Sequence, residues 1–262
     1  MLFRSYGQST TITATVAAVA PGAGTATGSV EFFDGLTSLG TATLSGGSAS
    51  LSTSALTVGN HSLTAVYAGD GSFNTSTSSA LSHDVNTANT TLTIVSSTNP
   101  SVKGQSVTFT ATASPSAATG TVTFYDGATS LGTASLSSGS ASLSTSALAV
   151  ATHTITASYG GDGTYNPANS DTVSQVVNAA ATSTSVASTP NPSVVGQSVA
   201  ITATVAVSSP GAGTATGSVE FFDGTTSLGT ATLSSGSATF NTSSLAVGSH
   251  SLTAQYLGSG DY

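Results

Sequence analysis

The chain has 262 residues, no cysteine, and a formal net charge of −8, with Lys103 and Arg4 as its only basic side chains besides histidine. Binding to nucleic acid or to anionic lipid needs clustered basic side chains, so the charge excludes the first partner and argues against the second. The lack of cysteine excludes disulfides and thiolate metal sites, and no apolar run reaches the roughly 18 residues that a membrane span requires.

One hairpin unit occurs three times in the chain. It reads V-T-F-Y-D-G-A-T-S-L-G-T-A-S-L at 122–136, and closely similar stretches stand at 30–44 and 219–233. Each copy predicts a strand, a tight Asp-Gly turn and a second strand, because Gly takes positive φ freely and Asp is a good turn residue. The chain is therefore a repeat protein with three units of about 90 residues, a size that can bury its own core.

The landmarks around the hairpin keep their spacing between the first and third copies. Gly7 corresponds to Gly196, and the loop Pro21-Gly22-Ala23-Gly24-Thr25 corresponds to 210–214. The middle copy lacks five residues in this loop. Loops tolerate such changes because little packing depends on them.

The middle copy predicts seven strands in chain order: 90–96, 106–113, 121–125, 130–136, 140–143, 152–159 and 171–178. Several of them alternate apolar and Thr or Ser residues, which is the pattern of a half-buried strand. No stretch shows the 3.6-residue period of an amphipathic helix. Seven short strands separated by turn signals predict an antiparallel β-sandwich.

The repeats predict three domains joined by linkers of a few residues. We expect repeat 1 at 1–86 without its first strand, a complete repeat 2 at 87–178, and repeat 3 at 179–262 without its last strand. The cut-off ends indicate a piece of a longer array with an open strand edge at each end. Short linkers favour an elongated array.

The core of each sandwich must be built without tryptophan or cysteine. In the middle copy the candidates are large apolar residues of the predicted strands: Phe109, Phe124, Leu143, Ile155 and Tyr159. Only 5% of the residues are charged, against about 25% in an average soluble domain, so hydroxyl groups are expected to hydrate the surface.

The motif V-T-F-Y-D-G-A-T-S-L-G, followed by L-A-V-A-T-H-T-I-T-A-S-Y-G-G-D-G-T-Y-N, resembles the bacterial immunoglobulin-like repeats of group 3 in large surface and secreted proteins. The resemblance covers nearly the whole chain and recurs three times. It implies immunoglobulin-like sandwiches that serve as spacer or adhesive stalk modules on the bacterial surface or outside the cell. It implies no catalytic residues and no cofactor.

Polar residues that recur at the same repeat positions are the candidate site residues. His61, His153 and His250 stand at one repeat position, and Asp34, Asp126 and Asp223 precede the turn glycines. A residue copied together with the fold is more often structural, so we interpret the histidines as structural and the aspartates as turn residues. His83 stands alone beside Asp84 and is interpreted in the same way.

Asp70 and Asp162, each in a Gly-Asp-Gly loop, are the only metal candidates, for calcium. The signal is weak, because one carboxylate per loop is too few and the third copy has Ser259 there, with Asp261 two residues later. No metal site, catalytic set or cofactor site is therefore predicted.

Two functions follow. The first is a non-enzymatic spacer of a bacterial surface or secreted protein, with neighbouring repeats as its partners and with adhesion to a host or surface glycan or protein as an added role. The alternative is a carbohydrate- or ligand-binding accessory module of a secreted enzyme. Carbohydrate sites present exposed aromatic platforms, and most aromatic residues here occupy predicted core positions, which favours the spacer.

Overall fold

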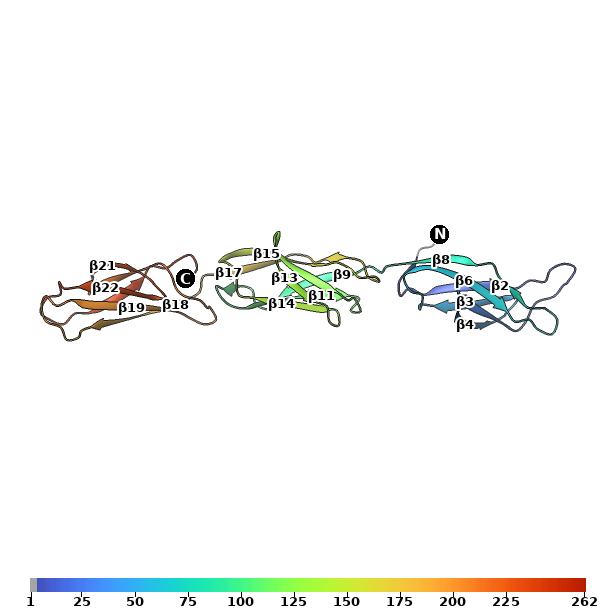
Figure 1. The fold of residues 1–262 in the computed structure, drawn as a ribbon, viewed down its shortest axis with the longest axis horizontal. Coiled ribbons are helices and arrows are strands. Elements are labelled where there is room, and N and C mark those ends of the chain that lie inside the picture. The colour runs from blue at the N-terminus through green and yellow to red at the C-terminus, as the bar shows by residue number, and fades with distance from the viewer. Residues whose placement is uncertain (1–3) are drawn as a thin grey trace.

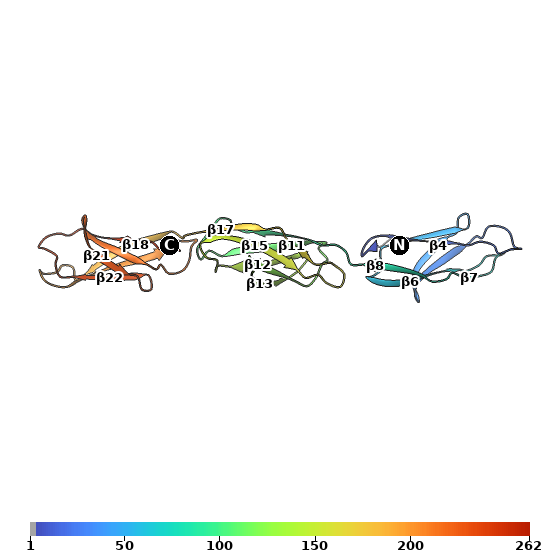
Figure 2. The same cartoon turned by 90° about the horizontal axis from the view of Figure 1, so that it is seen from above.

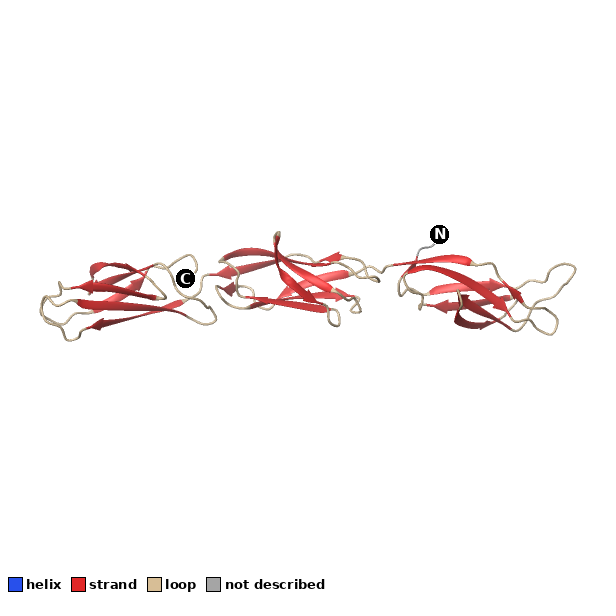
Figure 3. Ribbon diagram, in the orientation of Figure 1, coloured by secondary structure: helices blue, strands red, loops and turns tan. Residues whose placement is uncertain are grey.

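The computed structural model describes residues 4–262, and its regular structure there is entirely β-strand (Figure 3). Three sandwiches follow one another in an extended row, in both of two perpendicular views (Figures 1 and 2). The predicted all-β array of three tandem sandwiches is confirmed. Within residues 4–262 no helix could cross a membrane. The predicted start of repeat 1 includes residues 1–3, which lie outside the described range.

The middle repeat contains nine strands in two sheets: β9 (Thr91–Ser96), β10 (Ser101–Val102), β11 (Val107–Ser114), β12 (Thr121–Asp126), β13 (Thr129–Ser135), β14 (Ser140–Thr145), β15 (Ala151–Tyr159), β16 (Ala168–Asn169) and β17 (Val173–Asn178). One sheet has the order β14-β11-β9, and the other has the order β10-β17-β15-β12-β13, with β16 against β15. The prediction of seven strands missed β10 and β16, because two-residue strands are too short to show alternation.

The alternating residues explain both faces of the smaller sheet. Val107, Phe109 and Ala111 of β11 point into the sandwich and are at most 1% exposed. The threonines between them point outward and meet serines of β14. Thr108 Oγ1, for example, lies 2.7 Å from Ser144 Oγ. Cross-strand hydroxyl pairs of this kind stabilise the sheet without charge.

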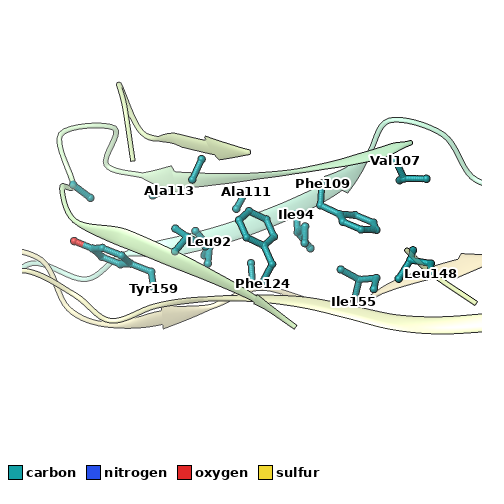
Figure 4. Packing of buried hydrophobic residues seen from close by; sticks show 14 of the residues in the cluster. Leu92, Ile94, Val107, Phe109, Ala111, Ala113, Phe124, Leu148, Ile155 and Tyr159 are labelled. Carbon is teal, nitrogen blue, oxygen red and sulfur yellow. The ribbon is translucent and has the colours of Figure 1, made fainter. Parts of the chain in front are cut away.

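Aromatic and branched residues from both sheets fill the space between them (Figure 4). Of the predicted core residues, Phe109, Phe124, Ile155 and Tyr159 are at most 1% exposed, which agrees with the prediction. Leu143 is only half-buried and packs against the edge of the cluster. Full burial of each large side chain stabilises the fold by about 1.5–3 kcal/mol.

Leu143 has a second role beside the hairpin. A Cβ atom at Gly132, whose φ is +139°, would stand 3.4 Å from Leu143 Cδ1. The same hairpin position in the third repeat is Gly229, where a Cβ would stand 2.7 Å from Phe240. Phe240 stacks on Phe221 with ring centroids 5.9 Å apart. The S-L-G-T motif therefore carries glycine because a side chain of the next strand packs over it.

The first repeat contains eight strands: β1 (Arg4–Ser5), β2 (Thr10–Thr15), β3 (Ser29–Asp34), β4 (Thr37–Thr43), β5 (Ser48–Thr53), β6 (Gly59–Tyr67), β7 (Ser76–Thr77) and β8 (Leu81–Asn86). Its larger sheet has the order β1-β8-β6-β3-β4, and its smaller sheet consists of β2 and β5. Arg4 and Ser5 pair in parallel with Val85 and Asn86, as Ser101 and Val102 pair with β17 in the middle repeat.

The third repeat contains six strands: β18 (Thr182–Thr189), β19 (Val199–Val207), β20 (Ser218–Asp223), β21 (Thr226–Thr232), β22 (Ser237–Thr242) and β23 (Leu252–Tyr256). They form two sheets of three strands, β18-β19-β22 and β21-β20-β23. Within residues 179–262 this repeat has no counterpart of β17, which pairs with residues 151–155 in the middle repeat. The domain boundaries at residues 86/87 and 178/179 stay a prediction.

Candidate functional site

The polar features of residues 4–262 fall into three kinds. No three histidine, cysteine, aspartate or glutamate residues in this range lie close enough to hold a metal ion. What the repeats share instead is a His–Asp pair in each sandwich, an aspartate-centred loop in the first two, and bonded junctions between successive repeats.

The His–Asp pair joins two landmarks that the sequence repeats. His61 Nδ1 donates to Asp34 Oδ2 at 2.7 Å, and His61 Nε2 donates to the carbonyl oxygen of Thr57 at 2.8 Å. The backbone N–H of Ser62 also donates to Asp34 Oδ1, at 3.2 Å. The aspartate was interpreted as a turn residue, but its carboxylate bonds to the neighbouring strand β6.

The other repeats contain the same arrangement. His153 Nδ1 lies 2.7 Å from Asp126 Oδ2, and His250 Nδ1 lies 2.6 Å from Asp223 Oδ2. The Nε2 atoms reach the carbonyl oxygens of Ala149 and Ala246 at 2.9 and 3.0 Å. The pair therefore ties the hairpin turn, a central strand and the loop before that strand together in all three repeats. The structural interpretation of these histidines fits this geometry.

Both ring nitrogens face groups that only accept hydrogen bonds, so the arrangement favours the doubly protonated imidazolium. Burial alone would lower the pKa of His61, but the hydrogen bonds to Thr57 and Asp34 outweigh burial and raise the pKa above its ordinary value. The pKa of His153 is raised in the same way, against burial, by Ala149 and Asp126.

The two calcium candidates have carboxylates surrounded by protein donors. Asp162 Oδ2 accepts from the N–H and the hydroxyl of Thr119 at 2.9 and 2.8 Å, and Oδ1 accepts from the N–H groups of Thr164 and Tyr165 at 2.7 Å each. Although burial alone would raise the pKa of Asp162, these four hydrogen bonds hold it well below its ordinary range.

Asp70 has the matching four hydrogen bonds, to Thr27, Ser72 and Phe73, at 2.7–2.8 Å. Its pKa is lowered first by the Thr27 hydroxyl and then by backbone N–H groups. Each loop offers a calcium ion one carboxylate, and its two oxygens already accept four hydrogen bonds. The ion would have to compete with these four donors. The geometry favours a loop-fixing role for Asp70 and Asp162.

The junction between repeats 1 and 2 uses the loop that Asp162 fixes. The backbone N–H of Ala88 donates to the carbonyl oxygen of Thr164, and the N–H of Asn166 donates to the carbonyl oxygen of Ala88, both at 2.8 Å. The Asn166 side chain also bonds to Thr87 and Asn89 of the linker. The linker is therefore paired with the repeat that follows it.

An aromatic contact closes the same junction. Tyr6 of repeat 1 and Tyr165 of repeat 2 meet edge to face, with ring centroids 6.0 Å apart and planes at 86°. Tyr165 is 9% exposed. Such a pair contributes about 0.5–1.5 kcal/mol beyond its buried area.

The junction between repeats 2 and 3 repeats the backbone bond but changes the side chains. The N–H of Ala180 donates to the carbonyl oxygen of Asp261 at 3.0 Å, as Ala88 does to Thr164. Lys103 Nζ lies 3.4 Å from Asp261 Oδ2. Lys103 and Tyr6 both directly precede the Gly-Gln-Ser motif. The chain terminus at Tyr262 lies beside this junction (Figure 1).

The longer loop of repeat 3 also contacts repeat 2. The N–H of Ala212 donates to the carbonyl oxygen of Lys103 at 3.1 Å. A Cβ atom at Gly104, whose φ is +78°, would overlap the carbonyl group of Ala212. Repeat 2 lacks five residues of this loop. At the junction between repeats 1 and 2, Tyr6 takes the place of the loop contact and packs against repeat 2. The sequence predicts that this difference in loop length is tolerated because little packing depends on the loop. In the structure the longer loop of repeat 3 lies at the interface with repeat 2.

The exposure of aromatic side chains bears on carbohydrate binding. Among residues 4–262, Tyr6 is the most exposed aromatic residue, at 36%, and it packs against Tyr165. Tyr67 and Tyr159 are at most 2% exposed and belong to the cores.

Comparison with solved structures gives matches of low overall similarity. Fibronectin(III)-like modules of Clostridium thermocellum CbhA are 21% identical over 66% of this chain and 89% of that chain, with a TM-score of 0.26. A putative membrane anchored protein from Corynebacterium diphtheriae is 16% identical over 84% of this chain and 64% of that chain, with a TM-score of 0.30. The ectodomain of mouse nectin-like molecule 4 is 10% identical over 91% and 86%, with a TM-score of 0.31.

No curated protein sequence matches the chain. The family comparison is decisive, because one model, described as the bacterial Ig-like domain (group 3), matches three times, at residues 4–86, 92–178 and 186–262. These matches follow the three sandwiches along the chain. The chain therefore belongs to the bacterial Ig-like domain (group 3) family and carries three tandem copies of its domain.

Proposed function

We propose that the chain is a non-enzymatic spacer of a bacterial cell-surface or secreted protein, which holds other parts of that protein at a distance. The observation that carries this proposal is the bonded junction. Each linker is paired by backbone hydrogen bonds with the next repeat, at Ala88 and at Ala180. A linker tied in this way resists bending, whereas a free linker of the same length would act as a hinge.

Family membership supports the same conclusion, because bacterial Ig-like repeats are found in large surface and secreted proteins. The polar groups that could have suggested chemistry are engaged with one another: histidines with aspartates, and loop aspartates with backbone N–H groups. We place the chain outside the cell or on its surface. Adhesion through the loops at the two ends of the array is an additional role within this proposal.

Small-angle X-ray scattering of the whole chain tests the proposal. A rigid row gives a pair-distance distribution with a long tail and a maximum dimension of three repeats in line. The matched control is a variant with a flexible Gly-Ser insertion between Asn178 and Ala179. The insertion should broaden the pair-distance distribution and lower the mean distance. If the unmodified chain already behaves like the insertion variant, the junctions do not hold the repeats in line and the spacer proposal loses its basis.

Carbohydrate binding, as in an accessory module of a secreted enzyme, is the competing function. Saturable binding to a glycan array, removed by Tyr6→Ala, would favour it. We expect no such binding, because the ring of Tyr6 is already engaged with Tyr165.

A further inference from the structure

Each hairpin turn contains the dipeptide Asp-Gly, and the structure needs both of its residues there. Gly35, Gly127 and Gly224 have φ values of +56°, +55° and +58°, in a region that favours glycine over residues with a side chain. The aspartate before each glycine makes the hydrogen bond to the histidine of the same repeat. The fold therefore places an Asp-Gly peptide in the hairpin of every repeat.

The Asp-Gly peptide is prone to a spontaneous reaction of the backbone, because glycine has no side chain to shield its nitrogen. The glycine nitrogen forms a bond to the aspartate Cγ, and one carboxyl oxygen leaves as water. This water carries one proton from the carboxyl group and one from the amide. The product is a cyclic imide, a succinimide.

Solvent water then opens the succinimide ring. Addition at Cγ restores aspartate, whereas addition at the main-chain carbonyl carbon breaks its bond to the glycine nitrogen and gives isoaspartate. In isoaspartate the main chain runs through Cβ and Cγ and is longer by one methylene group.

Isoaspartate in the middle hairpin would disturb two strand pairings. Asp126 pairs with Thr129 in the hairpin and with Ile155 of β15. An extra methylene group at this point would shift the register of both pairs. The remaining carboxylate would stand on Cα instead of Cβ and would no longer match the position of His153. A single reaction would therefore loosen the hairpin and the histidine together.

The structure holds the nitrogen that would react. The N–H of Gly127 donates to the carbonyl oxygen of Thr154 in β15 at 2.9 Å. The matching bonds of Gly35 and Gly224 are 3.0 and 2.9 Å long. Cyclisation would have to break this bond, because the nitrogen loses its proton in the reaction.

The histidine holds the carboxylate that would react. His153 Nδ1 donates to Asp126 Oδ2 at 2.7 Å, and His153 Nε2 is itself fixed by the carbonyl oxygen of Ala149 at 2.9 Å. In repeat 1 the other oxygen of Asp34 also accepts, from the N–H of Ser62 at 3.2 Å. The carboxylate therefore cannot turn toward the glycine nitrogen without losing a charge-assisted hydrogen bond.

We propose that the His–Asp pair protects the Asp-Gly peptide of each hairpin from cyclisation, and that these aspartates become sites of isoaspartate formation when the pair is lost. All three repeats contain the same two bonds, one at the glycine nitrogen and one at the carboxylate. Both bonds lead to the neighbouring strand, so the two reacting groups are held in place by one element. The inference does not depend on the spacer role, since the reaction requires only water.

A second Asp-Gly peptide in the middle repeat provides an internal reference. Asp162 precedes Gly163, and its carboxylate accepts hydrogen bonds from Thr119, Thr164 and Tyr165. These bonds do not involve His153. Unfolding of the whole repeat would expose both Asp-Gly peptides, whereas loss of the histidine side chain would release only the one in the hairpin.

The experiment measures cyclisation in the whole chain by mass spectrometry. The chain is incubated in water enriched in heavy oxygen, which enters each aspartate that cyclises and reopens, and peptide mapping locates the label. His153→Gln should raise the labelling rate of Asp126 about tenfold, because a hydrogen bond to a charged group is lost. The labelling rate of Asp162 should stay unchanged.

A core variant shows what loss of stability alone would do. Val107 lies in the other sheet and is 1% exposed, so Val107→Ala should destabilise the middle repeat without touching the His–Asp pair. This variant should raise the labelling rates of Asp126 and Asp162 together.

His61→Gln repeats the test in the first repeat and decides it if the middle repeat of the His153→Gln chain does not fold. Asp34 should then gain label, whereas Asp70, which has its own four hydrogen bonds, should not. Two results in a folded variant would overturn the proposal. One is a hairpin aspartate that labels no faster than in the unmodified chain. The other is an equal rise at the loop aspartate of the same repeat, since the pair would then act only through stability.

Discussion

The His153–Asp126 pair predicts that the middle repeat is more stable in mild acid than in mild base. Its imidazole donates to a carboxylate and to a backbone carbonyl at 2.7 and 2.9 Å, which requires both ring protons. These bonds raise the pKa of His153 above its ordinary value of 6.5, against the effect of burial. The histidine therefore holds its proton more tightly in the folded repeat than in the unfolded chain.

The direction of the pH effect follows from linkage. A group with a raised pKa in the folded state contributes stability that is fully present below the unfolded pKa and is lost as pH rises through the folded pKa. The window thus begins near pH 6.5 and extends upward.

The magnitude follows from the hydrogen bonds and their exposure. Bonds to charged groups contribute about 1.5–3 kcal/mol when well sheltered. The His153 and Asp126 side chains are 11% and 27% exposed, so solvent screens part of this interaction. We expect a loss of about 1–2 kcal/mol of unfolding free energy between pH 5.5 and pH 8.5.

Amide hydrogen exchange in β15 measures this loss for the middle repeat within the whole chain. The unmodified chain should lose protection with rising pH after correction for intrinsic exchange, whereas the variant Asp126→Asn with His153→Gln should show no such loss. The middle repeat is the cleanest place for this assay, because Gln175 lies opposite His153, whereas in repeat 1 the titratable His83 lies opposite His61. A stability of β15 that rises with pH, or does not change, would refute the reasoning.

Three further predictions concern the core, a loop and a junction. Phe124→Ala should cost about 3–5 kcal/mol and unfold the middle repeat first in denaturant, because Phe124 is fully buried; unfolding of all repeats together would contradict it. Asp162→Ala should lower the melting temperature and loosen the first junction, while calcium or chelator should leave the melting of the unmodified chain unchanged; a calcium-dependent rise would restore a metal site. Lys103→Ala should change stability by less than about 1 kcal/mol but widen the distance distribution between spin labels on repeats 2 and 3. A distribution of unchanged width would show that the ion pair with Asp261 does not restrain the junction.

Much of the fold could be predicted because its signals are local. Alternation over six to nine residues identified the long strands, and the Asp-Gly turns located the hairpins. The two-residue strands β10 and β16 could not be found in this way, since their pairing depends on β17 and β15, which lie far along the chain. Leu143 alternates like a core residue, but its place at the edge of the sandwich leaves it half-buried.

The candidate sites were harder to predict because the residues that form each site lie far apart in the sequence. Asp126 and His153 were each recognised as repeat landmarks, yet not as a pair; the signal available was the constant spacing that Asp34–His61 and Asp223–His250 share. The junction contacts join residues about as far apart as one repeat is long, such as Ala88 and Thr164. No local pattern marks them, although the position before Gly-Gln-Ser, which holds Tyr6 in repeat 1 and Lys103 in repeat 2, varies between copies.

Most of the few charged side chains of the chain take part in hydrogen bonds or ion pairs. Nine of the ten carboxylates within residues 4–262 bond to a side chain or to backbone N–H groups, including the three bonded to histidines, the two in loops and the one that faces Lys103. Solvent-facing positions carry threonine and serine, whose hydroxyls pair across the strands. Salt screens exposed charges most strongly, and few of them stand alone here. The array is therefore expected to keep its stability across a wide range of ionic strength.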